Sequence, residues 1–207
     1  AQSAAATGKP LARYWMHNGF VKINSEKMSK SLGNIFPVKE ILKHYHPEVL
    51  RLFMLQSHYR SPVDYSDDSL SEARAALFRC YRTLQQMKEL QGQLAAGSNP
   101  VATQTSGRVD DYVNAFQMLK DKFNEAMDDD FNTAQALGYV FDMVRQMNNF
   151  MMKEKSMPVA DQAAVLAAAV RVFDYFGSVL GVINSDADQF FVLYRETELR
   201  RRGLNAD

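Results

Sequence analysis

The sequence predicts a mainly α-helical protein, in which a short β-hairpin and a polar connecting loop precede an antiparallel helical bundle. Two observations support this fold class. After residue 66, apolar residues recur at steps of three and four, which places them on one face of successive helices. Before residue 24, aromatic and β-branched residues surround an Asn18-Gly19 pair, a combination typical of a hairpin turn.

The predicted hairpin occupies residues 13–23 and leads directly into the connecting loop. Its two strands would flank Asn18 and Gly19, a pair that favours tight hairpin turns. Tyr14 and Trp15 fall in the first strand. We expect both rings to pack against the protein rather than to form a platform for stacked bases.

Two short helices are expected after the loop, because Pro37 and Pro47 suit the first turn of a helix. His44 and His46 lie between these prolines, separated by one residue. A zinc site needs several converging ligands, and no cysteine or further histidine nearby completes such a set. We therefore predict no metal site in this chain.

Four amphipathic helices follow, and connections of this size predict an antiparallel bundle. Ser66 is the expected cap of the first helix, and residues 91–107, rich in Gly and Ser, are an expected flexible connection. The acidic run 128–130 follows the second helix. We expect its carboxylates to interact with the positive N-terminal end of the third helix, whose cap is Asn132 or Thr133.

A fifth helix with a basic end is expected from residue 186 onward. The chain then divides into three expected parts: residues 1–65 with the loop and connecting fold, residues 66–185 with the bundle, and residues 186–207 as the start of an extension. The first residue is not Met, and we expect a portion of a longer protein. No uninterrupted apolar run approaches the roughly 20 residues that span a bilayer, so no membrane association is expected.

The charge of the chain is unevenly distributed, although its net value is zero. Residues 1–60 hold nine Lys and Arg against three acids, which leaves 15 basic and 21 acidic residues of the 24 of each kind for the remainder. Polyanion binding is therefore favoured in the first third, although unrelated solvated faces explain the asymmetry equally well. The single cysteine, Cys80, excludes an internal disulfide and lies on an apolar helix face, where we expect a packed thiol.

The loop after the hairpin carries two lysines three residues apart, Lys27 and Lys30. Ser29 and Ser31 favour local turns, and Gly33 permits backbone angles that other residues avoid. Two ammonium groups on such a loop are suited to hold a polyphosphate, because protein groups that neutralise developing charge dominate phosphoryl and nucleotidyl chemistry. The alternative is a solvated basic turn, which a bare Lys-x-x-Lys usually is.

The five residues from Lys27 to Ser31 spell the KMSKS signature of class I aminoacyl-tRNA synthetases. Further stretches make the chain resemble the cysteinyl-tRNA synthetase family in particular, and five separated stretches agree in order. They are residues 14–19 (YWMHNG), 27–34 (KMSKSLGN), 47–53 (PEVLRLF), 58–62 (HYRSP) and 125–133 (EAMDDDFNT).

This resemblance implies roles for individual residues. Lys27 and Lys30 are expected to contact the ATP phosphates and to act as catalytic groups that stabilise charge on the departing pyrophosphate. Met28, Ser29 and Ser31 are expected to shape the loop that closes over ATP. Basic side chains of the connecting fold are candidates for tRNA binding: Arg51, His58 and Arg60.

The resemblance also implies the reaction of a cysteine–tRNA ligase, a cytoplasmic enzyme expected to be monomeric. Cysteine and ATP, with Mg²⁺, give cysteinyl-adenylate, and the cysteine is then transferred to tRNA(Cys). The family's second ATP signature, His-x-Gly-His, does not occur in these 207 residues, and the zinc ligands that recognise the thiol are expected outside this chain. The chain alone is therefore expected to be inactive.

Two alternatives remain open on sequence alone. The related ligase that joins cysteine to an amino sugar in mycothiol synthesis shares the loop and the adenylate step. A non-catalytic helical module that binds RNA or acts as an adaptor would need the bundle but not the paired lysines Lys27 and Lys30.

Overall fold

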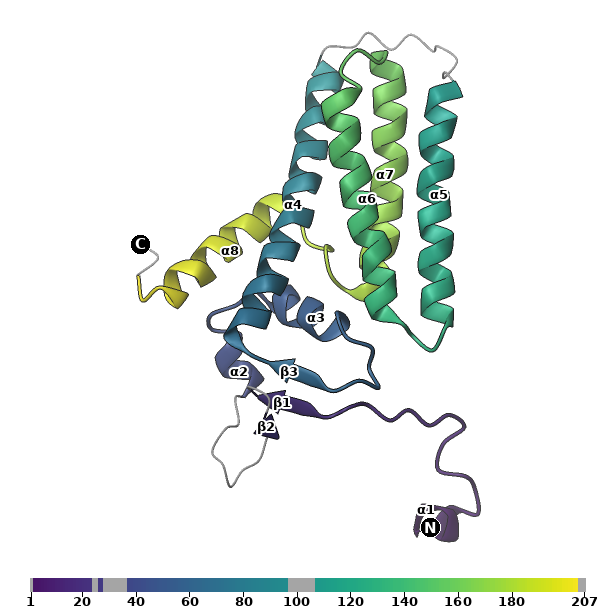
Figure 1. The fold of residues 1–207 in the computed structure, drawn as a ribbon, viewed down its shortest axis with the longest axis vertical. Helices are drawn as coiled ribbons and strands as arrows, with labels where there is room; N and C mark the ends of the chain where they lie inside the picture. The colour runs from purple at the N-terminus through teal and green to yellow at the C-terminus, as the bar shows by residue number, and fades with distance from the viewer. Residues whose placement is uncertain (1, 24–25, 28–36, 97–106, 205–207) are drawn as a thin grey trace.

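The computed structural model describes residues 2–23, 26–27, 37–96 and 107–204, and it confirms the mainly helical fold class (Figure 1). Strands in this described part are short and lie in the first third of the chain. In order, the elements are α1 Gln2–Thr7, β1 Val21–Ile23, β2 Glu26–Lys27, α2 Val38–Ile41, α3 Pro47–Leu55, β3 Val63–Tyr65, α4 Asp67–Ala96, α5 Gly107–Asp128, α6 Thr133–Lys153, α7 Val159–Leu180 and α8 Ala187–Arg201.

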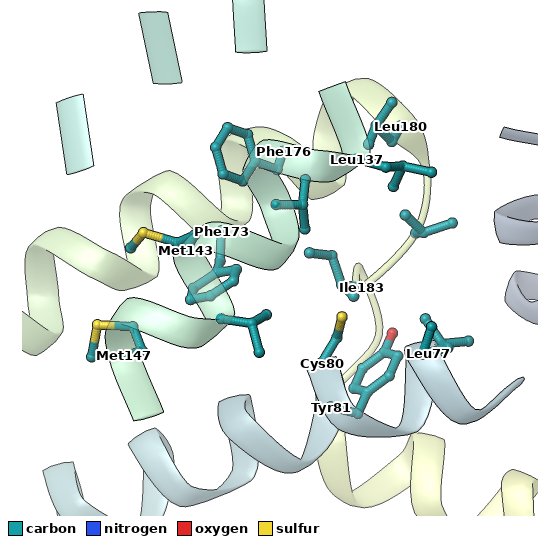
Figure 2. Close-up of a cluster of buried hydrophobic side chains, with 14 of the residues drawn as sticks. Leu77, Cys80, Tyr81, Leu137, Met143, Met147, Phe173, Phe176, Leu180 and Ile183 are labelled. Atoms are coloured by element: carbon teal, nitrogen blue, oxygen red, sulfur yellow. The ribbon is translucent and has the colours of Figure 1, made fainter. Parts of the chain in front are cut away.

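Helices α4 to α7 form the antiparallel bundle that the apolar spacing predicts. The α4 and α6 helices run one way and α5 and α7 the other, while α2, α3 and the strands lie at one end of the bundle (Figure 1). α5 packs on α6 and α7, and α4 packs on α3, α6, α7 and α8. Figure 2 shows side chains of α4, α6 and α7 meeting in the core, where Phe173, Phe176, Met143 and Met147 are buried.

α7 is long and apolar enough, by length and composition, to cross a membrane. Half of its most apolar window is buried in the protein, with Leu166, Phe173 and Phe176 among its fully or almost fully buried residues. α7 packs against α5, α4 and α6, so its apolar residues are explained by its place in the core of the bundle.

Side-chain caps begin the helices where the sequence predicts them. The Ser66 hydroxyl accepts a hydrogen bond from the Ser69 N–H at 3.1 Å, and Asn132 Oδ1 accepts one from the Gln135 N–H at 3.1 Å. Asp186 does the same for α8, accepting from the N–H of Asp188 at 3.0 Å. These acceptors satisfy N–H groups that have no partner inside the helix.

Replacing Asn132 by alanine is expected to lower the free energy of unfolding by about 1 kcal/mol, because it removes the side-chain cap of α6. Asn132→Asp keeps an acceptor in place and should retain most of that stability. Chemical denaturation of both variants measures the difference, and equal stability of Asn132→Ala and the parent protein would contradict the capping role.

The expected interaction of the acidic run 128–130 with the N-terminal end of α6 stays a prediction, and the structure gives the run further partners. Asp128 is the last residue of α5, and Asp130 lies in the turn with a left-handed φ of 54°. The Asp130 carboxylate accepts a hydrogen bond from the Tyr59 hydroxyl at 2.8 Å. A carboxylate placed between two helices is attracted by the nearest donors, and here these lie in the connector after α3.

The hairpin forms at a different place from the one predicted. β1 pairs antiparallel with β2 around residues 24–25, with Lys22 opposite Lys27, and it pairs in parallel with β3. Residues 13–20 form no strand. The Gly19 N–H donates to the Tyr59 carbonyl at 2.7 Å, and a Cβ at Gly19 would lie 2.8 Å from Pro62 N. This glycine therefore permits a close approach of two backbones rather than a turn.

The two aromatic residues of the expected first strand are exposed. The side chains of Tyr14 and Trp15 are 88% and 63% accessible, so the expectation that they pack is wrong for this structure. Their segment has no strand partner among the described residues, and a side chain without a covering layer stays in solvent.

Cys80 is a buried thiol in the core of the bundle, as its place on an apolar face predicts. It lies on α4 beside Tyr81 and Ile183 (Figure 2). Burial raises the pKa of this thiol to about 12, because the thiolate would lose its hydration there.

We expect Cys80 to be unreactive toward thiol reagents in the folded protein at pH 8 and to react once the protein is unfolded. The folded state keeps the thiol proton to higher pH than the unfolded state. Its contribution to stability is therefore complete below pH ~9 and is lost at up to ~1.4 kcal/mol per pH unit as pH rises toward the folded pKa. Denaturation at pH 8 and pH 10 measures this loss, and an equally steep loss in Cys80→Ala would assign it to other groups.

Candidate functional site

The lysine loop emerges from a small sheet whose order is β2-β1-β3. The backbone of Lys27 ends β2, and its partner in the register is Lys22 on β1. Met28, Ser29, Lys30 and Ser31 lie outside the described residues. The structure thus places the first lysine of the KMSKS string at the end of a strand.

The sheet is attached to α3 through β3. The Val63 N–H donates to the Phe20 carbonyl at 3.0 Å next to the paired strands. Phe53 of α3 packs edge to face on Tyr65 of β3, with ring centroids 6.2 Å apart. Ile23 of β1 and Val63 of β3 are buried. These contacts fix the strand that carries Lys27 relative to α3.

The connector between α3 and β3 forms a polar cluster with the turn between α5 and α6. Arg60 Nε lies 2.8 Å from Asp130 Oδ2, and His58 Nε2 lies 3.9 Å from the same oxygen. The His58 ring stacks on Tyr59, with centroids 4.9 Å apart. The Arg60 side chain remains 62% exposed, so the guanidinium is accessible to a further anion while it is paired. Such an exposed pair contributes little to stability.

Arg51, the third candidate for tRNA binding, lies apart from that cluster on α3. It is exposed, and its guanidinium lies against Gly181 at the end of α7, where a Cβ would approach Nη1 to 2.8 Å. The structure therefore brings His58 and Arg60 together and places Arg51 at the junction between α3 and the bundle.

His46, one of the two histidines between Pro37 and Pro47, has a structural role at the start of α3. His46 caps α3, because its Nδ1 accepts from the Glu48 N–H at 3.1 Å, and its ring packs on Phe190 with centroids 4.9 Å apart. Burial lowers the pKa of His46 and favours the neutral ring. Within the described residues, no group of three or more His, Cys, Asp or Glu side chains is placed to hold a metal. These residues do not fit a zinc centre.

Sequence reasoning missed Glu48, which lies buried in the first turn of α3. From the sequence, a glutamate after Pro47 is an ordinary favourable charge at a helix N-terminus. Its hydrogen-bond partners, Tyr81, Ile183 and Ser185, lie 33 to 137 positions away along the chain. No local signal in the sequence points to them.

A groove of about 530 Å³ lies between α4 and α8. Aromatic and arginine side chains line it, including Phe78, Phe191, Arg82 and Arg195. None of its lining residues comes from the first third of the chain, so it is separate from the lysine strand.

Two known family models match this chain, one over the part that contains the lysine loop and one over part of the helical bundle. Residues 1–75 match the model of the tRNA synthetases class I (C) catalytic domain, and residues 122–184 match that of the DALR domain. The agrobacterial LeuRS of Agrobacterium radiobacter K84, solved in a ternary complex with tRNA and LeuAMS, superposes with a TM-score of 0.58 over 86% of this chain and 21% of that one. At 18% identity this likeness shows the fold alone. The class is that of the class I aminoacyl-tRNA synthetases.

Comparison with individual proteins identifies the family more narrowly. Cysteine–tRNA ligase of Geobacter sulfurreducens is 50% identical over 191 residues, which cover 92% of this chain and 37% of that protein. That of Geobacter metallireducens is 50% identical over 190 residues, or 92% of this chain and 38% of the relative. The Caldicellulosiruptor saccharolyticus protein is 52% identical over 148 residues, 72% of this chain and 30% of its own length. The chain belongs to the cysteine–tRNA ligase family, and it spans less than half the length of these relatives.

Proposed function

We propose that this chain supplies the KMSKS loop and the tRNA-facing helices of a cysteine–tRNA ligase. The observation that supports it most is that Lys27, the first residue of the KMSKS string, ends a paired strand of the sheet that contacts α3. The whole activity needs further polypeptide, and the 207 residues alone are expected to be inactive.

In the proposed reaction, a carboxylate oxygen of cysteine attacks the α-phosphorus of ATP. The bond between the α-phosphorus and the bridging oxygen breaks, and pyrophosphate leaves with Mg²⁺ neutralising part of its charge. Lys27 and Lys30 stabilise the negative charge that builds on the leaving phosphates, with Met28, Ser29 and Ser31 forming the loop around ATP. A ribose hydroxyl of tRNA(Cys) then attacks the carbonyl carbon of the adenylate, and AMP leaves.

We further propose that residues 1–65 complete the catalytic domain, residues 66–185 form the helical domain and residues 186–207 begin an extension. Arg51, His58 and Arg60 are the proposed contacts to the tRNA backbone, where arginine suits phosphate recognition. The exposure of the Arg60 guanidinium supports this role. The proposed enzyme is a cytoplasmic monomer without membrane association.

Cysteine-dependent ATP–pyrophosphate exchange followed by charging of tRNA(Cys) tests this function in the protein as its gene encodes it. Both activities are expected. Exchange without charging of tRNA would indicate the ligase that uses an amino sugar as acceptor, and absence of exchange would indicate a non-catalytic module.

A further inference from the structure

Glu48 is the centre of a buried polar network that joins α3 to the bundle. Its carboxylate accepts hydrogen bonds from the Tyr81 hydroxyl at 2.9 Å, the Ser185 hydroxyl at 2.9 Å and the Ile183 N–H at 2.6 Å. The Tyr81 hydroxyl also accepts from the Ser185 N–H at 3.0 Å. A buried carboxylate is tolerated when donors satisfy its oxygens, as they do here.

The segment that Glu48 holds, residues 181–185 between α7 and α8, has an unusual backbone. Ile183 has a φ of 54° and a side chain that is only 6% exposed. A β-branched residue rarely adopts this conformation, and it persists only where surrounding contacts impose it. Glu48 accepts from the N–H of this same residue, and Figure 2 shows the Ile183 side chain beside Cys80 and Tyr81.

The same face of α3 holds the start of this segment. Arg51 follows Glu48 by three positions, which places the two side chains on neighbouring sites of the helix surface. Its guanidinium lies against Gly181, whose φ of 65° ends α7. Glu48 therefore holds residues 183–185 against α3 by hydrogen bonds, and the Arg51 side chain lies beside the start of the same segment.

Other residues of α3 contact the sheet that contains the lysine strand, which is the strand that ends at Lys27. Phe53 packs on Tyr65 of β3, β3 pairs with β1, and β1 pairs with the strand that ends at Lys27. α3 thus contacts both the bundle and the sheet that contains the lysine strand, and β3 also contacts α4 directly.

We propose that Glu48 and Tyr81 are positioning residues that set the helical bundle relative to the lysine strand, so that tRNA held along the bundle presents its end to the adenylate. This inference rests on the proposed function. Adenylate formation needs ATP and cysteine beside the loop, whereas transfer also needs the correct placement of the bundle. Loss of the network should therefore impair transfer much more than activation.

Tyr81→Phe tests this in the protein as its gene encodes it, because it removes one hydroxyl from the network and keeps the ring. Tyr175→Phe is the matched control, since its hydroxyl donates at 2.6 Å to Asn124 within the bundle. We expect Tyr81→Phe to lower kcat/KM for tRNA charging by about tenfold or more, as small misplacements of reacting groups do. Pyrophosphate exchange should stay within about twofold, and Tyr175→Phe should leave both rates within about twofold.

Ser185→Ala is the second variant, and it removes one donor to Glu48 while the Tyr81–Glu48 contact remains. Ser185→Ala should also lower tRNA charging more than pyrophosphate exchange, but by a smaller factor. If Tyr81→Phe does not fold, Ser185→Ala provides the test of the inference. Equal losses of exchange and charging, or no loss in either variant, would overturn the inference, while exchange together with charging of tRNA(Cys) by the parent protein would still uphold the proposed function. Absence of exchange in the parent protein would contradict the proposed function and this inference with it.

Discussion

Lys30→Ala is expected to lower the rate of cysteine-dependent ATP–pyrophosphate exchange by about 100- to 1,000-fold, the usual cost of removing one group that stabilises transition-state charge. Lys27→Ala should act in the same direction, because its ammonium group precedes Lys30 in the same loop. The binding of cysteine should change little, since the proposed role concerns the phosphates. Steady-state exchange kinetics in the protein as its gene encodes it measure these effects.

Lys39→Ala is the control for charge. Lys39 lies exposed on α2, shortly after the loop, and has no proposed contact with ATP. Its removal lowers the positive charge of the region by the same amount and should leave exchange within about twofold. If Lys39→Ala and Lys30→Ala reduced exchange equally, the lysines would act through the general field of the basic first third rather than at the phosphates.

Phe123→Ala is expected to lower the free energy of unfolding by about 3–5 kcal/mol, the largest stability effect that we predict for a single substitution. The Phe123 ring on α5 is fully buried, and it lies 4.6 Å from the Phe176 ring on α7, measured between centroids. Truncation removes this contact and leaves a cavity between two helices of the bundle. Chemical denaturation measures the loss.

Phe131→Ala is the matched control, because it removes the same side chain from an exposed position. The Phe131 side chain is 52% accessible, and alanine is no better suited than phenylalanine to its φ of 55°. The change in unfolding free energy should stay within about 0.5 kcal/mol. A large loss in this variant, or a small one in Phe123→Ala, would contradict the assignment of the core.

The helical half of the fold could be predicted because its signals are local. Apolar steps of three and four predicted the bundle. Ser66 was predicted to begin α4, and Asn132 or Thr133 to begin α6, of which Asn132 is the cap, since a cap needs only its own neighbours. The expected basic helix after residue 186 is α8.

The sheet was harder to predict, because its pairing depends on distant residues. Asn18-Gly19 resembles a hairpin turn, yet Gly19 is needed for its approach to residues 59–62. β1 pairs with β3 across some forty positions, and no short window contains that information.

The candidate site was predictable only as a string of residues. The KMSKS sequence points to Lys27 and Lys30 as candidates, but the attachment to α3 of the sheet that contains Lys27 follows from contacts made after folding. Glu48 and Asp130 show the same limit, because the partners of each carboxylate come from other helices or loops. Local sequence reports charge and helix position, whereas tertiary structure decides what a carboxylate binds.

Cysteine-dependent ATP–pyrophosphate exchange is the most direct test of the central claim, measured on the 207 residues alone and on the protein as its gene encodes it. We predict no exchange from the 207 residues and exchange that requires cysteine from the whole protein, with loss of that activity in Lys30→Ala. Absence of exchange in the whole protein, or exchange that Lys30→Ala leaves unchanged, would contradict the assignment of this chain to the ATP site of a cysteine–tRNA ligase.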